Sequence, residues 1–235
     1  MEAPPPSRWQ TATVKSVTTE TRRAKTFRLV LSQPTRHLAG QHYLVRLTAP
    51  DGYRATRSYS VASPPDDSGE IEITVERLED GEVSSYLHEE VVVGDELEVR
   101  GPIGGFFVWR GDTPALFVGG GSGVVPLMAM LRLARRQGTT GLVRLVVSVG
   151  RPEDLFYAQE LPGPETKVVF TRAAPADCNR PPGRLRQDDL EAMVLPGAVA
   201  YVCGTSDFAD HVTGLLDRLG VRNERIRVER FGPSG

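Results

Sequence analysis

The chain has 235 residues, of which 40% are hydrophobic and 25% charged, and its formal net charge is −2 at pH 7. This balance is typical of one or two globular domains, and it excludes a protein that gathers nucleic acid or an anionic membrane through a strong positive field. Two cysteines without a Cys/His cluster predict no metal site, and the lack of a leader or long apolar run predicts a cytoplasmic protein.

The first half of the chain reads as short strands separated by turns rich in Pro, Gly and Asp. Apolar alternation predicts strands in TATVKSV, TFRLVL, HYLVRL, RSYSVA, EIEITVERL and DELEVRG. Regular short strands of this kind are typical of an antiparallel Greek-key β-barrel. One short helix is predicted over 84–90.

The pattern changes after Asp112-Thr113-Pro114. Buried strands are predicted in ALFVG, LVRLVVSV, KVVF and AVAYVCG, and they alternate with helical patterns over 126–136, 154–161, 187–194 and 206–219. This alternation indicates an α/β domain with a parallel sheet covered on both faces. We therefore expect two domains, residues 1–111 and 112–235.

The predicted strand RSYSVAS, residues 57–63, places a guanidinium beside a phenol. Because side chains alternate along a strand, Arg57 and Tyr59 share one face, and Ser58 and Ser60 share the other. A flat ring system tethered to a phosphate would use both Tyr59 and Arg57, the latter through charge-assisted hydrogen bonds. A barrel-wall tyrosine beside a surface arginine is the alternative.

A glycine-rich turn over 119–126 joins the strand LFVGG to a helical pattern. Glycines at such a turn let a diphosphate approach the backbone, and the helix start offers free N–H groups. The spacing differs from GxGxxG, so a plain tight turn is the alternative. The candidate phosphate-binding residues are Gly120, Gly121, Ser122, Gly123 and Pro126.

Six motifs follow one another in a familiar order: RSYS, GEVSSYL, GPIGGFF, the glycine-rich turn, YVCGTSDF and ERFG. Over residues 9–232 the chain resembles the ferredoxin–NADP reductase superfamily. The resemblance implies an FAD-binding barrel over 1–111, an NAD(P)-binding α/β domain over 112–235, and hydride transfer from the nicotinamide to flavin N5.

The resemblance also implies the flavin-binding residues. Tyr59 would lie against the isoalloxazine, Arg57 would bind phosphate, and Ser60 would hydrogen-bond near N5. A hydroxyl residue at the cap of the short helix would hold the pyrophosphate, and Phe106 or Phe107 is either an adenine contact or core. The full flavin set is Arg57, Ser58, Tyr59, Ser60, Gly81, Val83, Ser84 and Phe231.

The nicotinamide side is implied by the end of the strand AVAYVCG. Cys203 and Gly204 lie at the carboxyl edge of the predicted sheet, where ligands bind in this class of fold. The resemblance places Cys203 beside the nicotinamide, Glu229 near its junction with the flavin, and Phe231 over the flavin's other face. Ser60, Cys203 and Glu229 are thus the candidate catalytic residues, and the alternative for Cys203 is a small buried hydrophobe.

Three arginines after the strands of the second domain, Arg151, Arg172 and Arg184, indicate a site for the 2′-phosphate of NADPH. No acidic residue follows Val149 to bind a ribose diol, so NADPH is favoured and NADH is the alternative. Two charged hydrogen bonds of about 1.5–3 kcal/mol each would discriminate strongly.

The electron acceptor is expected to be a separate entity, because the chain lacks the cysteines of an iron–sulfur domain. A ferredoxin, a flavodoxin, another redox subunit and a small molecule are all open. Two other functions remain as alternatives: a free-flavin reductase that uses flavin as a substrate, and a non-catalytic flavin or nucleotide sensor. The sequence leaves FAD against FMN and the oligomeric state open.

Overall fold

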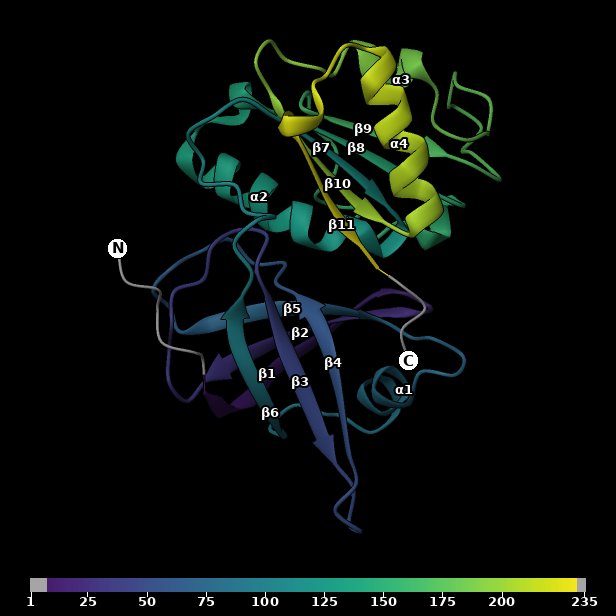
Figure 1. Ribbon diagram of the computed structural model, residues 1–235. Coiled ribbons are helices and arrows are strands. Elements are labelled where there is room, and N and C mark those ends of the chain that lie inside the picture. The colour runs from purple at the N-terminus through teal and green to yellow at the C-terminus, as the bar shows by residue number, and fades with distance from the viewer. Residues whose placement is uncertain (1–7, 232–235) are drawn as a thin grey trace.

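A computed structural model describes residues 8–231 and has two layers, an antiparallel β-barrel and a parallel sheet with helices (Figure 1). The predicted fold class is confirmed. The barrel contains α1 (Glu82–Glu89) and six strands, β1 (Trp9–Thr21), β2 (Ala24–Leu31), β3 (His42–Thr48), β4 (Arg54–Ser60), β5 (Glu70–Glu76) and β6 (Glu96–Ile103).

The barrel strands lie in the order β4-β3-β6-β1-β2-β5, and all neighbours are antiparallel. The two edge strands meet where β4 ends, because Val61 bridges Ile73 and the Ala62 amide donates to the Glu72 carbonyl at 2.7 Å. The sheet therefore closes at the end of β4. Alternate residues fill the interior, as the apolar alternation predicted.

The second layer is a parallel sheet in the order β11-β10-β7-β8-β9. Along β7, Phe117 packs on α2, whereas Leu116 and Val118 pack on α4, so the two helices cover opposite faces. The regular elements of this layer are β7 (Ala115–Gly120), α2 (Val124–Gln137), β8 (Val143–Val149), β9 (Thr166–Phe170), α3 (Gln187–Glu191), β10 (Val199–Gly204), α4 (Ser206–Arg218) and β11 (Ile226–Arg230).

One predicted helix is wrong. Over 154–161 the chain forms only a 3-10 turn, Pro152–Asp154, followed by irregular backbone in which Tyr157 has φ 55°. The Tyr157 amide donates to the Glu20 carboxylate at 3.0 Å, and its hydroxyl bonds to that of Thr74 at 2.5 Å. Contacts with the barrel, which leave no local pattern, override the helical periodicity here.

Other bounds differ by a few residues. The helix predicted over 187–194 ends at Glu191, and the one predicted over 84–90 begins at Glu82. Strand β11 was not predicted, although it pairs along its whole length with β10. Its five residues include Arg227, Glu229 and Arg230, which mask the apolar signal of a buried strand.

The two layers share one apolar cluster, in which Ala39 and Ala62 of the barrel pack with residues of α2. Close approach depends on Gly40, where a Cβ would lie 1.9 Å from the Phe107 carbonyl oxygen and 2.7 Å from the Met130 side chain. Its φ of +102° also favours glycine. This packing holds the end of the barrel against the lower side of α2 (Figure 1).

Within residues 8–231, no helix has the length and hydropathy needed to cross a bilayer. The same described range contains no cluster of three or more His, Cys, Asp or Glu side chains that could hold a metal ion.

Candidate functional site

The carboxyl end of β4 carries the first group of candidate residues. Tyr59 packs on the barrel core. Strand alternation puts Arg57 on the same face of β4 as Tyr59 and as the buried residues Ala55 and Val61. Ser60 ends the strand and is 6% exposed, whereas Ser58 is exposed. Strand alternation puts Tyr59 and Ser60 on opposite faces, so a ligand that touches both has to lie across the end of β4.

Several polar groups at this end have unused hydrogen-bonding capacity. Arg57 donates to the neighbouring Thr56 carbonyl at 2.8 Å, and it has no ion-pair partner within the described chain. Tyr43, directly opposite Tyr59 on β3, is fully buried, and its hydroxyl has no partner among residues 8–231. Burial raises the pKa of Tyr43 to about 12 and that of Tyr59 further, so both phenols are neutral.

The turn before α1 is shaped by Ser84. Its hydroxyl donates to the Gly81 carbonyl at 3.1 Å and accepts from the Leu78 amide at 3.2 Å. The N-cap is Gly81, so the expectation of a hydroxyl at the cap is wrong, and Ser84 lies inside the first turn. No side chain caps the helix, which leaves its first amides without a side-chain acceptor, while Val83 anchors the turn in the barrel core.

The glycine-rich turn connects β7 to α2 through a 3-10 turn, Gly121–Gly123. Gly121 adopts φ +55°, and open space surrounds its missing Cβ. A Cβ on Gly123 would lie 2.1 Å from the Cys203 carbonyl oxygen, so only glycine lets the turn pack on β10. The N-terminus of α2 also has no side-chain cap, and Pro126 lies buried in its first turn.

Gly120 is half-buried beside Phe208 of α4, and Ser122 is half-buried at the open side of the turn. Glycines, one small hydroxyl and an uncapped helix N-terminus form a donor set suited to a phosphate. These residues are brought together by the β7–α2 connection, as the sequence predicted. Whether they bind a nucleotide remains a prediction.

Cys203 and Glu229 lie side by side on the paired strands β10 and β11. Cys203 is fully buried, and burial together with the Glu229 charge raises the pKa of its thiol well above the ordinary value. Burial also raises the pKa of Glu229 to about 7. The pair is therefore a neutral thiol next to a carboxyl that titrates near neutral pH.

The chain beyond Glu229 stays attached to β10, because the Phe231 amide donates to the Gly204 carbonyl at 2.9 Å. Phe231 is half-buried against the apolar cluster that joins the layers. The sequence after it, residues 232–235, lies outside the described part of the chain. In Figure 1, the carboxyl end of β11 reaches the boundary between the parallel sheet and the barrel.

The three arginines assigned to phosphate recognition are exposed. Arg151 lies 3.7 Å from the Glu153 carboxylate, whereas neither Arg172 nor Arg184 has an ion-pair partner within 8–231. The Arg172 amide donates to the Gly150 carbonyl at 2.9 Å, which fixes it at the carboxyl edge of β8 and β9. The Gly183 amide donates to the Phe170 carbonyl at 3.0 Å, so Arg184 starts beside the end of β9 as well.

The two phenylalanines of GPIGGFF differ. Phe107 is buried, edge-on to Tyr201 with ring centroids 5.5 Å apart, and belongs to the core. Phe106 is 67% exposed, and the Arg227 guanidinium lies 5.7 Å from its ring centroid. Of the two alternatives for an aromatic adenine contact, only Phe106 has a free face.

Comparisons with known proteins identify both layers. Residues 11–108 match the model of the oxidoreductase FAD-binding domain, and residues 117–214 match that of the oxidoreductase NAD-binding domain. The chain is 30% identical over 240 residues to the ferredoxin–NAD(P)(+) reductase component of naphthalene 1,2-dioxygenase/salicylate 5-hydroxylase systems from Ralstonia sp., covering 98% of this chain and 71% of the relative. The chain belongs to the ferredoxin–NADP reductase superfamily. It is an oxidoreductase with FAD- and NAD(P)-binding domains.

Other relatives agree with this assignment. The glycine betaine monooxygenase reductase subunit of Chromohalobacter salexigens is 33% identical, covering 91% of this chain and 61% of its own length. The FAD/NAD-binding domain of nitric oxide dioxygenase from Vibrio cholerae superposes with a TM-score of 0.85 at 27% identity, covering 95% of this chain and 99% of that one. The chain spans only 52–71% of the length of the first curated relatives.

One residue that carries many contacts was missed by sequence reasoning. Arg180, in the loop between β9 and α3, makes five hydrogen bonds to Asp189 and to loop carbonyls. A lone arginine in a Pro-rich loop gives no periodic signal, and the sequence offered no means of distinguishing it from a solvated charge.

Proposed function

We propose that the protein takes hydride from NADPH onto a bound FAD and passes the electrons to a separate redox protein. The observation that carries this proposal is the pairing of Cys203 on β10 with Glu229 on β11, near the carboxyl edge of the parallel sheet. FAD supplies a ring that accepts a hydride and releases electrons singly, and the protein supplies binding, orientation and electrostatics.

The barrel end suits a flavin nucleotide in its donor set. Arg57 has unpaired guanidinium N–H groups for a phosphate, and the uncapped amides of α1 provide a second anion site. Tyr59 offers a flat ring, and the buried Tyr43 hydroxyl lacks a partner within 8–231. An unsatisfied buried hydroxyl is costly, so a bound polar group next to β4 would stabilise this region.

Three residues are proposed to act on the reacting atoms. Ser60 would donate a hydrogen bond at the end of β4, and the Cys203 thiol would contact the nicotinamide as a neutral group. Glu229 would hold or release a proton beside them, because its pKa of about 7 lets both protonation states exist at neutral pH. The remaining residues of the two turns would bind phosphates.

Arg172 and Arg184 are proposed to bind the 2′-phosphate of NADPH, since both start beside the end of β9 and neither is ion-paired in the described chain. Arg151 would contribute less because Glu153 lies within 3.7 Å. We also propose the domain division at 111/112, which falls in the gap between the two matched segments, 11–108 and 117–214.

The acceptor is proposed to be a ferredoxin or oxygenase component. Several relatives are named as reductase components of oxygenase systems, including a propane 2-monooxygenase reductase component from Rhodococcus jostii, 28% identical over 77% of this chain. Those names describe the relatives, and for this chain they support a one-electron protein acceptor in preference to a small molecule.

Anaerobic reduction of the purified protein with NADPH and NADH in parallel tests the proposal, followed by release and chromatography of the flavin. We expect a yellow protein that contains FAD and is reduced faster by NADPH at equal concentration. Faster reduction by NADH would contradict the role of Arg172 and Arg184. A colourless protein that turns over added flavin would instead indicate a free-flavin reductase, and failure to reduce ferricyanide would indicate a sensor.

A further inference from the structure

The loop between β9 and α3 is organised around one guanidinium, that of Arg180. Its Nε donates to Asp189 Oδ1 at 2.8 Å, and its Nη2 donates to Asp189 Oδ2 at 2.7 Å and to the Arg184 carbonyl at 2.8 Å. Its Nη1 donates to the carbonyls of Pro181 at 3.0 Å and Gly183 at 3.2 Å. A guanidinium has five N–H donors, and all of them are used, three on loop carbonyls and two on Asp189 of α3.

The Asp189 carboxylate, which accepts two of these hydrogen bonds, has further partners of its own. Its side chain is 8% exposed, and it also accepts from the Arg186 amide at 2.9 Å and lies 3.2 Å from Lys167 Nζ. Burial opposes its ionisation, but the hydrogen bonds from Arg180, the Arg186 amide and Lys167 lower its pKa to about 2. The carboxylate therefore stays charged and ties the loop to both β9 and α3.

The held backbone is the segment that carries Arg184. Arg180 bonds the Gly183 and Arg184 carbonyls from one side, and the Phe170 carbonyl accepts from the Gly183 amide on the other. The Arg184 side chain itself remains exposed. The backbone of Arg184 is thus ordered before any ligand arrives, while its guanidinium is free.

We propose that Arg180 is a positioning residue for recognition of the 2′-phosphate of NADPH. It does not touch the cofactor, because all its donors are occupied. It acts by fixing the backbone from which Arg184 reaches the phosphate, so that binding does not have to order a Pro- and Gly-containing loop. This inference rests on the NADPH preference proposed above.

The proposal requires an arginine at this position, not only a positive charge. Lysine has three donors on a single nitrogen, which cannot hold a bidentate carboxylate and three carbonyls together. Arg180→Lys therefore keeps the charge and removes the fork. Arg222→Lys is the matched control, since Arg222 is an exposed arginine whose side chain pairs only with Glu224, at 2.8 Å, within the described residues.

The experiment measures KM and kcat for NADPH and NADH with the flavin-loaded full chain. For Arg180→Lys we expect KM for NADPH to rise about tenfold, a change of about 1.4 kcal/mol, with kcat at saturation changed by less than about twofold. The ratio of KM for NADPH to KM for NADH should rise, and amide hydrogen exchange over 178–186 should accelerate. Arg222→Lys should leave all of these values unchanged.

Coupling to Arg184 separates positioning from a general structural role. Arg184→Ala should raise KM for NADPH, and adding Arg180→Lys to it should raise it little further, because the positioned group is already gone. Fully additive effects would overturn the proposal. If Arg180→Lys does not fold, Asp189→Asn, which keeps the side-chain size, carries the same test.

The outcomes distinguish this inference from the function on which it rests. A wild-type protein without NADPH preference would overturn both. A wild-type preference that survives unchanged in Arg180→Lys, with unchanged hydrogen exchange, would overturn only the role of Arg180.

Discussion

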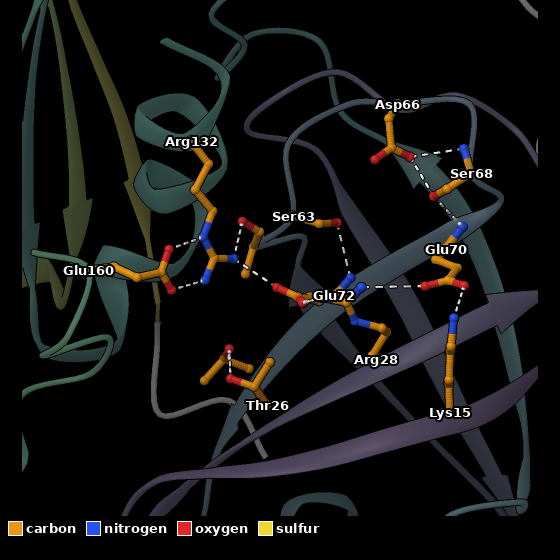
Figure 2. Close-up of polar contacts among 12 residues, drawn as sticks. Lys15, Thr26, Arg28, Ser63, Asp66, Ser68, Glu70, Glu72, Arg132 and Glu160 are labelled. Carbon is orange, nitrogen blue, oxygen red and sulfur yellow. Dashed lines mark hydrogen bonds and ion pairs between the residues drawn. The ribbon is translucent and has the colours of Figure 1, made fainter. Parts of the chain in front are cut away.

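The junction between the two layers has two sides of opposite character. On one side, Arg132 of α2 donates to the Ala62 carbonyl at 2.9 Å and to Glu72 at 2.8 Å, both in the barrel segment, and forms a bidentate pair with Glu160. Figure 2 shows its guanidinium between Glu160 and Glu72. The hydroxyl pair of Thr74 and Tyr157 lies on the same interface and also crosses it.

A cavity of about 320 Å³ opens beside this network. Its charged lining is already paired, for example Arg28 with Glu70 and Glu72, and Arg136 with Asp66 at 3.2 Å. A ligand bound there would have to displace existing ion pairs. We therefore describe the cavity as a part of the interface and not as a binding site.

The other side carries the candidate site and is built differently. Among residues 8–231, no hydrogen bond or ion pair joins β4 to β10 or β11, although Tyr201 of β10 and Arg227 of β11 each donate to the Val108 carbonyl at 3.0 Å. Its polar groups are instead left with unmet capacity, as in the Arg57 guanidinium, or are held away from their ordinary pKa, as in Glu229. The satisfied contacts of Arg132 hold the two layers together, and the groups of the candidate site stay free for a ligand.

The largest expected effect concerns the contacts of Arg132 between the two layers. Arg132→Met should lower the free energy of unfolding by about 2 kcal/mol, because it leaves the half-buried Glu72 carboxylate with Arg28 alone and removes its partner across the two layers. Chemical denaturation of the wild-type and variant proteins measures this change in the free energy of unfolding. Arg136→Met is the control on the same helix, where the pair with Asp66 is half exposed and should contribute less than about 1 kcal/mol. Equal losses in both variants would contradict the comparison.

The next effect concerns the candidate site. Gly123→Ala should cost about 2 kcal/mol and strongly slow reduction by NADPH, since the new Cβ would overlap the Cys203 carbonyl and push the turn off β10. Flavin content of the purified protein should be retained, because the barrel is untouched. Gly141→Ala, where a Cβ meets open space, is the control. Retained NADPH reduction in Gly123→Ala would argue against a phosphate site in this turn.

A pH-dependent effect is expected from Glu229, whose pKa of about 7 in the folded protein lies above the ordinary value of about 4.3. A raised carboxyl pKa means that ionisation disfavours the fold, so wild type loses stability relative to Glu229→Gln as the pH rises from about 4.3 to about 7. Because Glu229 is half-buried, we expect a relative gain for the variant of about 1–2 kcal/mol at pH 8 over pH 4.

Denaturant unfolding of both proteins at the two pH values measures this difference. The same titration should appear in hydride transfer as an inflection near pH 7 in wild type that is absent from Glu229→Gln. A parallel pH dependence of stability in the two proteins would contradict the burial of this carboxyl.

The smallest effect distinguishes the two cysteines. Cys203 is fully buried with a raised thiol pKa, whereas Cys178 is half-exposed in the loop after β9. Only a thiolate reacts readily, so brief alkylation of the native protein should label Cys178 and spare Cys203. Peptide mass spectrometry reads the result, and unfolding in denaturant before labelling should expose both. Prompt labelling of Cys203 in the native protein would contradict the burial of its thiol.

The sequence by itself determined the two-layer fold, the order of motifs, and the strand and glycine-rich turn that carry Arg57, Tyr59 and Gly121. These are local patterns, in which period-two or helical alternation and turn residues act over a few positions. The same local reasoning failed at 154–161, where Tyr157 bonds to distant barrel residues, and at the cap of α1, where the Ser84 hydroxyl bonds to Gly81 and Leu78 without capping the helix.

Only the tertiary structure decided which distant residues meet. It paired β11 with β10, which sets Glu229 beside Cys203, and it set Tyr157 against Glu20 and Thr74 of the barrel. Burial, and with it the pKa of Glu229, also arises only when the layers pack. Contacts of this kind join residues far apart in the chain and depend on desolvation, so they leave no periodic trace in the sequence.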